Sequence, residues 1–300
     1  MLSKVKPSFF HFSLLFIQPI FMTSNIAIAK GALGNIPPVS LAFWRWLVVC
    51  LIILPFVYSE IRKNQKYILQ ELPKLTFLAF TGFGICGAFP YISGLTTTVT
   101  NMSIIYALAP IIIVLFSGIL FKEKLSTIQL IGVITSFAGV SFIIFKGNWS
   151  NFFHLNLTLG DLWILGAAIS WAFFSIYLVN WKSKFSIFAR FTIMGLIGSI
   201  ILFPFYMIEN FYFIPTQFNN TFILFVILAS LFPGVLAFTM YTKLQQLIGA
   251  SLTGLTVYLM PIYGAIYGLI LFGEVFHYFH FFGAALVLTG IFLANKKFSK

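Results

Sequence analysis

Long runs of apolar residues, separated by short polar connections, follow one another along the whole chain. Ten of these runs have about 20 residues, the length that an α-helix needs to cross about 30 Å of hydrocarbon. An outer-membrane barrel would instead show short segments of alternating polarity, a pattern that the sequence lacks. We therefore predict an all-α integral membrane protein with ten transmembrane helices. The predicted helices span residues 9–29, 38–58, 74–95, 101–121, 127–145, 159–181, 187–208, 221–243, 250–272 and 277–294.

The composition agrees with a surface that faces lipid. Charged residues make up 8% of the chain and hydrophobic residues 60%, with a mean hydropathy of +1.01, whereas a soluble domain has about 25% charged residues. A net charge of +12 would suggest a nucleic-acid partner in a soluble protein. Here the charges stand singly between apolar runs, so we expect the bilayer and no nucleic acid as a partner. Cys50 and Cys86 lie in apolar runs without ligand spacing, which predicts neither a disulfide framework nor a zinc site.

The first apolar run has an alternative interpretation as a secretory signal. Lys4 and Lys6 precede it, and residues 27–29 resemble an A-x-A cleavage site. The run is longer than a usual signal core, contains polar residues such as Gln18 and Asn25, and has a counterpart in the second half of the chain. We therefore retain it as the first transmembrane helix.

The positive residues predict the orientation in the membrane. If the N-terminus is inside, 14 of the 18 Lys and Arg residues lie on the inner side, and Lys30 and Lys146 lie outside. The other two, Arg45 and Arg190, fall within predicted spans. Because positive residues concentrate on the cytoplasmic side, we predict that both termini are cytoplasmic.

The two halves of the chain contain the same four residue types at the same spacings. A proline, a glutamate and two glycines recur with the same spacings at a constant offset of 151 residues. The offset also relates Ser24 to Ser175, and a slightly shorter connection relates Arg45 to Arg190. The repeated residues are Pro110, Glu123, Gly132 and Gly139 in the first half, and Pro261, Glu274, Gly283 and Gly290 in the second.

Each half holds five predicted helices, and an odd number means that the second half enters the membrane from the opposite side. The sequence therefore predicts two inverted five-helix repeats (5+5), over residues 1–146 and 158–295. Inverted repeats are the architecture of many secondary transporters, which bind substrate near the midplane between the halves. A nucleotide-driven pump would need a P-loop, which the sequence lacks.

With Gly160-Asp161-Leu162 opening the sixth predicted helix, this doubled signature resembles the EamA-type transporters of the drug/metabolite transporter superfamily. The resemblance covers nearly the whole chain and departs in the first half, which has Phe121-Lys122-Glu123 where the second has Gly273-Glu274. It implies a 5+5 bundle in a bacterial inner (plasma) membrane that exports amino acids or other small metabolites by alternating access. A nucleotide-sugar, drug or lipid carrier of the same fold, or a channel, remains the alternative.

Polar and aromatic side chains within the spans are the candidates for a substrate cavity, because a polar tip at mid-membrane needs a partner or a wet cavity. Pro110 and Pro261 join them, because proline frees a backbone carbonyl inside a helix, although the two prolines could also merely shape the helices. For each aromatic residue, a place in the core or at the interface is the alternative. The candidates are Ser24, Asn25, Arg45, Tyr91, Tyr106, Pro110, Trp171, Tyr177, Arg190, Tyr241, Tyr258 and Pro261.

Arg45 is the most informative candidate. It lies about 10 Å into its predicted helix, where a charge costs about 2.5–3.5 kcal/mol. One interpretation is that its side chain snorkels to the interface beside Trp44 and Trp46. The other is that Arg45, the repeat partner of Arg190, orients an anionic group of the substrate.

The acidic residues all fall at predicted helix ends or in connections, so no buried carboxylate relay for protons is visible. Coupling to protons therefore stays open. An integral membrane enzyme would need clustered polar residues at one depth, and we expect no enzyme. Gly82-x-Gly84-x-x-Gly87 has no preceding strand and Glu274-x-x-His277-x-x-His280 spreads around a helix, so we expect no cofactor and no metal site.

Overall fold

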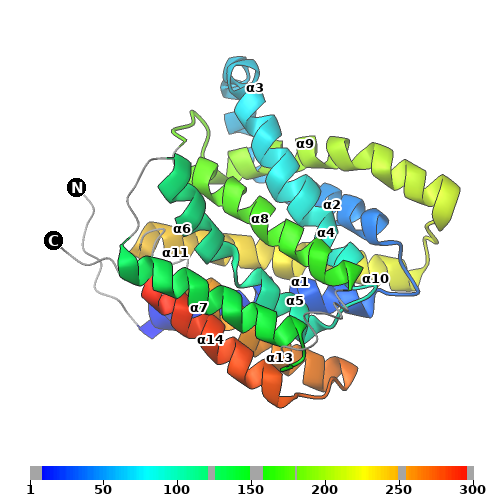
Figure 1. The fold of residues 1–300 in the computed structure, drawn as a ribbon. Helices are drawn as coiled ribbons and strands as arrows, with labels where there is room; N and C mark the ends of the chain where they lie inside the picture. Colours follow the sequence, from blue (N-terminus) through cyan, green and yellow to red (C-terminus); the bar gives the residue numbers. More distant parts are fainter. Residues whose placement is uncertain (1–8, 121–125, 149–157, 180, 249–254, 296–300) are drawn as a thin grey trace.

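The computed structural model describes residues 9–120, 126–148, 158–179, 181–248 and 255–295, and every regular element in these ranges is helical (Figure 1). Where the predicted spans fall on described residues, each overlaps one helix or consecutive helical segments. The elements are α1 Phe9–Gly31, α2 Pro38–Lys63, α3 Lys66–Ala79, η1 Phe80–Ile85, α4 Cys86–Ser93, α5 Val99–Tyr106, α6 Ala109–Leu120, α7 Thr127–Ile144, α8 Leu159–Val179, α9 Ile187–Ile208, η3 Glu209–Phe213, α10 Asn220–Ala229, η4 Ser230–Leu236, α11 Ala237–Ile248, η5 Leu255–Leu259, α13 Met260–Phe272 and α14 Tyr278–Asn295.

Within the described ranges, six helical stretches are long and apolar enough to cross a membrane, and four further apolar helices are shorter. The third predicted span was placed too late, because its helix begins at Lys66 rather than at residue 74. The helix of the second span likewise continues to Lys63. Backbone hydrogen bonds continue through polar residues where hydropathy falls, so the apolar run underestimates the helix.

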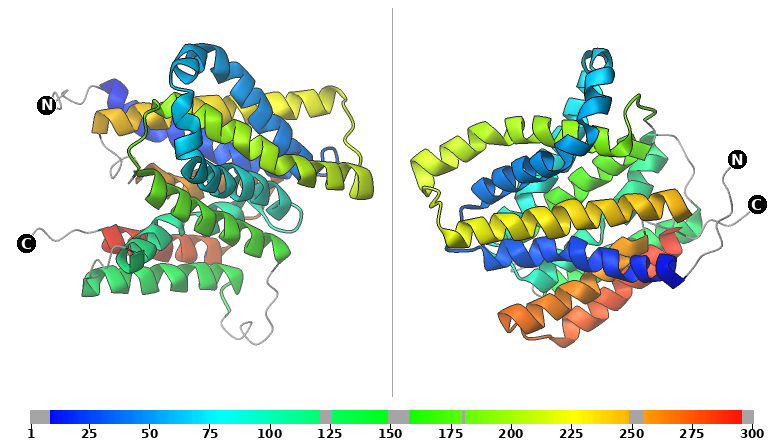
Figure 2. Two further views of the ribbon diagram at one scale, coloured as in Figure 1. Left: turned by 90° about the horizontal axis from the view of Figure 1, so that it is seen from above. Right: turned by 180° about the vertical axis from the view of Figure 1, so that it is seen from behind.

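The helices lie beside one another in a bundle, with the start of α1 and the end of α14 at the same end (Figures 1 and 2). Many large apolar side chains face outward, among them Phe56, which is 83% exposed, and Ile200, which is 71% exposed. Contiguous exposed apolar surface of this extent is typical of a lipid-facing exterior.

Helices α2 and α9 belong to different halves and are joined at both ends by carboxylates. Glu209, after the end of α9, accepts hydrogen bonds from Val39 N (3.0 Å), Ser40 N (2.7 Å) and Ser40 Oγ (2.9 Å) at the start of α2. Glu60, near the end of α2, accepts from Ser186 N (2.5 Å) and Ser186 Oγ (2.7 Å) at the start of α9. The first N–H groups of a helix lack partners and attract negative charge. Each half therefore caps a helix of the other.

The repeated glycines meet where α7 crosses α14. A Cβ on Gly139 would lie 2.7 Å from Gly283 O, and a Cβ on Gly283 would lie 2.9 Å from Gly139 O. A Cβ on Gly290 would overlap the carbonyl oxygen of Gly132. The four glycines therefore form two facing pairs that bring the backbones into contact, as small residues do between membrane helices.

Two π-helical segments occupy equivalent places in the two halves. Segment η1 covers residues 80–85 and η4 covers 230–236, which agrees with the offset of 151 found in the sequence. A π-helical turn within an α-helix is uncommon and often marks a functional site. Both segments contribute residues to the cavity described next.

Candidate functional site

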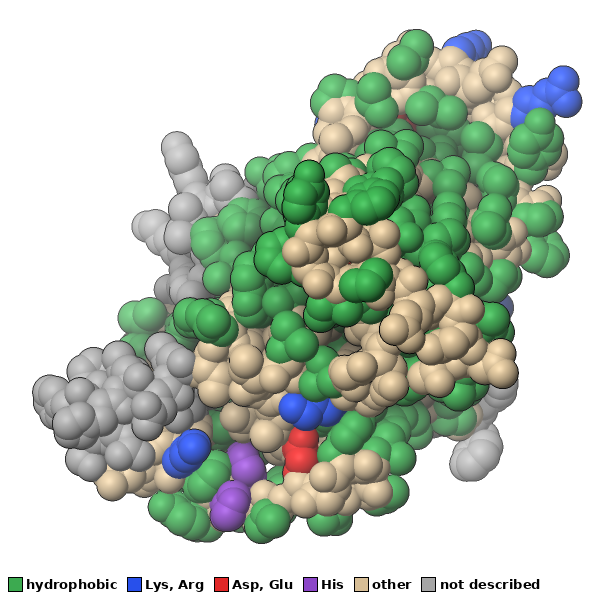
Figure 3. Space-filling view, turned by 90° about the vertical axis from the view of Figure 1, so that its right-hand side faces the viewer, with side chains coloured by type: hydrophobic (Ala, Val, Ile, Leu, Met, Phe, Trp, Pro, Cys, Tyr) green, Lys and Arg blue, Asp and Glu red, His purple; other side chains and the backbone are tan. Residues whose placement is uncertain are grey.

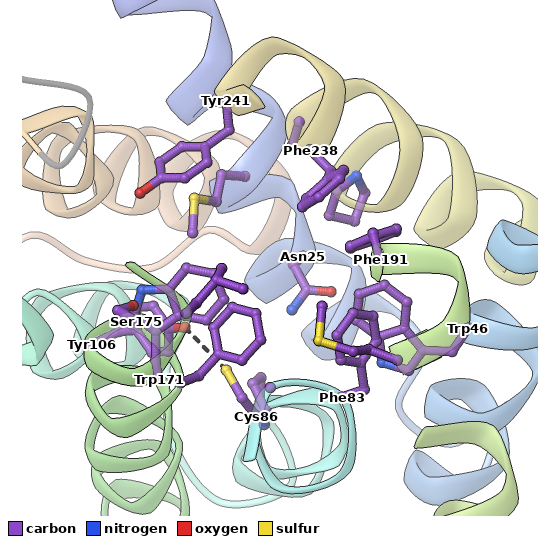
Figure 4. A pocket seen from close by; sticks show the side chains of 18 of the residues that line it. Asn25, Trp46, Phe83, Cys86, Tyr106, Trp171, Ser175, Phe191, Phe238 and Tyr241 are labelled. Atoms are coloured by element: carbon purple, nitrogen blue, oxygen red, sulfur yellow. Dashed lines mark hydrogen bonds between the residues drawn. The ribbon is translucent and has the colours of Figure 1, made fainter. Parts of the chain in front are cut away.

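A central cavity of about 150 Å³ lies between the two halves of the chain (Figure 4). Elements of the first half, from α1 to α5, and elements of the second half, from α8 to α13, alternate around it. Segment η1 contributes Gly82 and Phe83, and η4 contributes Pro233. Most of the lining is apolar, and aromatic rings surround the amide of Asn25. The aromatic lining residues are Trp46, Phe83, Tyr106, Trp171, Phe174, Phe191, Phe238 and Tyr241.

The cavity extends toward the end of the bundle at which α1 begins. Leu178 in the last turn of α8 and Ile187 in the first turn of α9 both line it. The connection between these two helices lies at that end, on the left in Figure 1. The lining therefore reaches from the middle of the bundle to the end that also holds the end of α14.

The opposite end of the bundle contains residues 94–98, which connect α4 to α5, and the first residues of α5. Lys30 donates from Nζ to the carbonyl oxygens of Gly94 (3.1 Å) and Thr97 (2.9 Å), and Thr97 Oγ1 donates to Asp161 Oδ1 (2.5 Å). Glu274 accepts from Val99 N (2.7 Å) at the start of α5.

Glu274 also accepts from Thr100 N (3.1 Å) and Thr100 Oγ1 (2.7 Å). Charged side chains from both halves therefore hold this connection, which we call the clamped end. Seen from the right-hand side of Figure 1, the surface is mainly hydrophobic and uncharged, with few charged side chains (Figure 3).

Arg45 lies inside the bundle and is 4% exposed. Its Nη1 donates to Asn25 Oδ1, which also accepts from Tyr91 Oη at 2.7 Å. The guanidinium lies 4.2 Å from the ring centroid of Trp46 and 5.2 Å from that of Tyr91, within the range of cation–π attraction. The snorkelling interpretation of Arg45 is therefore wrong, because the side chain turns inward to neutral partners.

Arg190, the repeat partner of Arg45, lines the cavity near the start of α9 and is half-buried. Its Nη1 donates to Trp181 O (3.3 Å), and the guanidinium lies 5.4 Å from the ring centroid of Trp181. The two arginines therefore occupy different depths of one cavity. Cys86 and Tyr106 form another polar contact in the lining, with Sγ and Oη 3.1 Å apart.

Half of the candidates taken from the sequence line the cavity, namely Asn25, Arg45, Tyr106, Trp171, Arg190 and Tyr241. Tyr91 is buried behind the lining, where it holds Asn25. Ser24 lies outside the lining, and its hydroxyl donates back to Phe21 O (2.7 Å). Tyr177 is also outside it: the side chain is 46% exposed and stacks edge-on against Phe77, on the outer surface.

Pro110 and Pro261 are not part of the lining, but both lie where a helix changes course. Each is the second residue of a new α-helix, α6 after the break that follows Tyr106 and α13 after the 3₁₀ segment η5. Proline fits the first turn of a helix because its missing N–H would be unpaired there. The side chain of Tyr258 lies outside the described residues.

Several lining residues were not among the candidates. Trp46 and Phe191 directly follow the repeated arginines, so the repeat could have identified them. Gln18 is fully buried in α1 with no hydrogen-bond partner for Oε1 among the described residues, and a polar residue in an apolar span is itself a signal. Phe83, Phe174 and Phe238 had no signal, because phenylalanine is common throughout the chain.

The model of the EamA-like transporter family matches residues 10–145 and 158–296. An uncharacterised transporter of Archaeoglobus fulgidus is 25% identical over 284 residues, covering 95% of this chain and 96% of its own. The uncharacterised transporter YetK of Bacillus subtilis is 26% identical over 277 residues, covering 90% of this chain and 82% of its own.

A solved crystal structure has the same fold, with a TM-score of 0.62 at 18% identity over 94% of this chain and 95% of that one. The family model covers two repeats and most of the chain, over helices that surround one cavity. The chain belongs to the EamA-like transporter family of integral membrane proteins.

Proposed function

We infer that the protein is a secondary transporter that exports amino acids or other small metabolites across a bacterial inner membrane by alternating access. The central observation is the cavity, which both halves line and which is clamped at one end. A site between two repeats that rock against each other is the arrangement found in many secondary transporters. Because the cavity extends toward the end that bears most of the positive residues, it faces the cytoplasm, as loading for export requires.

Within this proposal, the six long and four shorter apolar stretches form ten spans in two inverted five-helix repeats, over residues 1–146 and 158–295. The equivalent π-helical segments and the reciprocal caps between α2 and α9 support this arrangement. Both termini are then cytoplasmic. We expect a fluorescent protein fused after Lys300 to fluoresce in cells, and alkaline phosphatase fused there to stay inactive. An active phosphatase fusion would contradict this topology.

Counterflow in proteoliposomes tests the transport activity. Vesicles that contain the purified protein and an unlabelled metabolite should accumulate the labelled form of that metabolite, with saturation and competition. The test uses pooled amino acids and organic acids, with and without a proton gradient, which also shows whether transport is coupled to protons. Rapid leak without saturation would indicate a channel and overturn the proposal.

A further inference from the structure

We propose that the cavity selects small organic anions, with the carboxylate of the ligand bound by Arg45 and Asn25 and its apolar body against the aromatic lining. This inference rests on the proposed transport function and narrows the metabolites that it would carry. The observation that motivates it is a deeply buried guanidinium without a counter-ion.

Arg45 carries a charge that no described group neutralises. Within the part of the chain that the structure describes, its Nε has no hydrogen-bond partner, and the guanidinium contacts the amide oxygen of Asn25 and the rings of Trp46 and Tyr91. Among the described residues that line the cavity there is no Asp or Glu. Burying an unpaired charge costs several kcal/mol, and a hydrogen-bonded anion offsets much of this cost. An entering carboxylate would supply the missing charge.

Asn25 orients a second donor toward the same place. Its Oδ1 is occupied by Arg45 and Tyr91, which leaves the Nδ2 group to donate elsewhere. In Figure 4 the amide nitrogen of Asn25 points into the space enclosed by the rings. A carboxylate oxygen accepts hydrogen bonds only, so it suits a guanidinium and an amide N–H together.

The remaining polar lining disfavours a positively charged ligand. Arg190 adds a second guanidinium, so the cavity walls carry two positive charges in a low-dielectric environment. Gln18 Oε1 is an acceptor without a partner among the described groups, but Gln18 precedes Asn25 by two turns of α1, about 10 Å along the helix. The ammonium of an α-amino acid could not reach it while the carboxylate lies at Arg45.

The size and lining of the cavity suit a compact apolar body. At about 30 Å³ for each water molecule, a cavity of about 150 Å³ has room for about five waters, and an apolar cavity of about this volume can bind benzene. Two pairs of closely packed rings line it. Trp46 lies 4.6 Å from Phe83, and Phe191 lies 3.6 Å from Phe238, between ring centroids.

Three probes that share a benzyl group test the selection: phenylacetate, its neutral amide phenylacetamide, and the cation 2-phenylethylamine. Binding to the purified full chain is measured by calorimetry and by the fluorescence of the tryptophans at the site. Since hydrogen bonds to charged groups contribute about 1.5–3 kcal/mol, phenylacetate should bind about tenfold or more tightly than the amide. The cation should bind least. Equal binding of acid and amide, or preference for the cation, would overturn the inference.

Variants assign the selection to Arg45. Arg45→Gln should reduce the affinity for phenylacetate to that for the amide, whereas Arg62→Gln, on the same helix but exposed, should leave it unchanged. Asn25→Asp places a carboxylate beside Arg45, so it should abolish phenylacetate binding without loss of folded protein. This variant keeps the test decisive if Arg45→Gln does not fold. Undiminished binding in either variant, once it is shown to be folded, would refute the role of Arg45.

The failure of this inference and that of the transport function are distinguishable. Binding of phenylacetate without counterflow of any metabolite would leave the anion site in place and remove the carrier. Counterflow of a neutral or cationic metabolite, with no preference for phenylacetate, would keep the carrier and remove the anion site.

Discussion

Replacing Gly290 by alanine is expected to destabilise the protein, although alanine is the better helix former. A Cβ at this position would overlap Gly132 O and Ser136 Oγ and lie 2.6 Å from Ser136 N. Two of these are backbone atoms of α7, which cannot move without shifting the helix. Overpacking of this kind costs about 1–3 kcal/mol. We therefore expect the melting temperature of the purified protein to fall by about 5 °C.

Gly84→Ala is the matched control. A Cβ there would make ordinary contacts, the nearest at 3.6 Å from Ile201 Cγ2. Alanine in place of glycine in a helix favours folding by up to about 1 kcal/mol, so this change should leave the melting temperature unchanged or raise it. If both variants shifted the melting temperature in the same direction, the contact between α7 and α14 would not be the cause.

Glu274→Gln is expected to open the clamped end of the cavity. The carboxylate accepts three hydrogen bonds at the start of α5, whereas an amide has one oxygen and turns its NH₂ toward a donor. Hydrogen bonds to a charged group contribute about 1.5–3 kcal/mol. Losing one such contribution should raise the population of the state open at this end about tenfold.

A single thiol in the cavity can report this change. Cys50 and Cys86, the two cysteines of the chain, are replaced by alanine, and Ser175 in the lining is replaced by cysteine. A membrane-impermeant thiol reagent is then added to right-side-out and inside-out vesicles. We expect Glu274→Gln to raise the labelling rate of Ser175→Cys from the outside, with little change from the inside.

Glu60→Gln is the control, because Glu60 makes two hydrogen bonds to Ser186 at the opposite end of the bundle. If this variant increased outside labelling as much as Glu274→Gln did, the effect would be general loosening rather than release of the clamped end.

The repeat in the sequence predicted more of the structure than the single spans did. The constant offset marked the glycines that meet between α7 and α14 and the prolines that begin α6 and α13. The roles of these residues could be predicted because each depends on the backbone. A glycine allows two helices to approach closely, and a proline fits the start of a helix because it has no N–H.

The orientation of each helix about its axis could not be predicted. In a soluble helix a polar stripe marks the outer face, but here lipid and core are both apolar. Phe203 is 48% exposed and Phe191 lines the cavity, although both are phenylalanines of α9. Trp171 and Tyr177 differ by about 120° around α8. Trp171 therefore lines the cavity and Tyr177 lies on the surface, and the local sequence does not distinguish the two positions. The π-helical segments add a further rotation that no propensity encodes.

The caps between α2 and α9 mean that neither half is complete alone. The first half holds the carboxylate of Glu60 but needs Glu209 for its own helix start, and the second half has the converse need. A fragment containing only one half would have both a helix start without its cap and a carboxylate without its N–H groups. Such a fragment could pair its helix start and its carboxylate only by binding the missing half, or by binding a second copy of itself in the opposite membrane orientation. Each half therefore needs the other for its helix caps, whether or not a peptide bond joins the two halves.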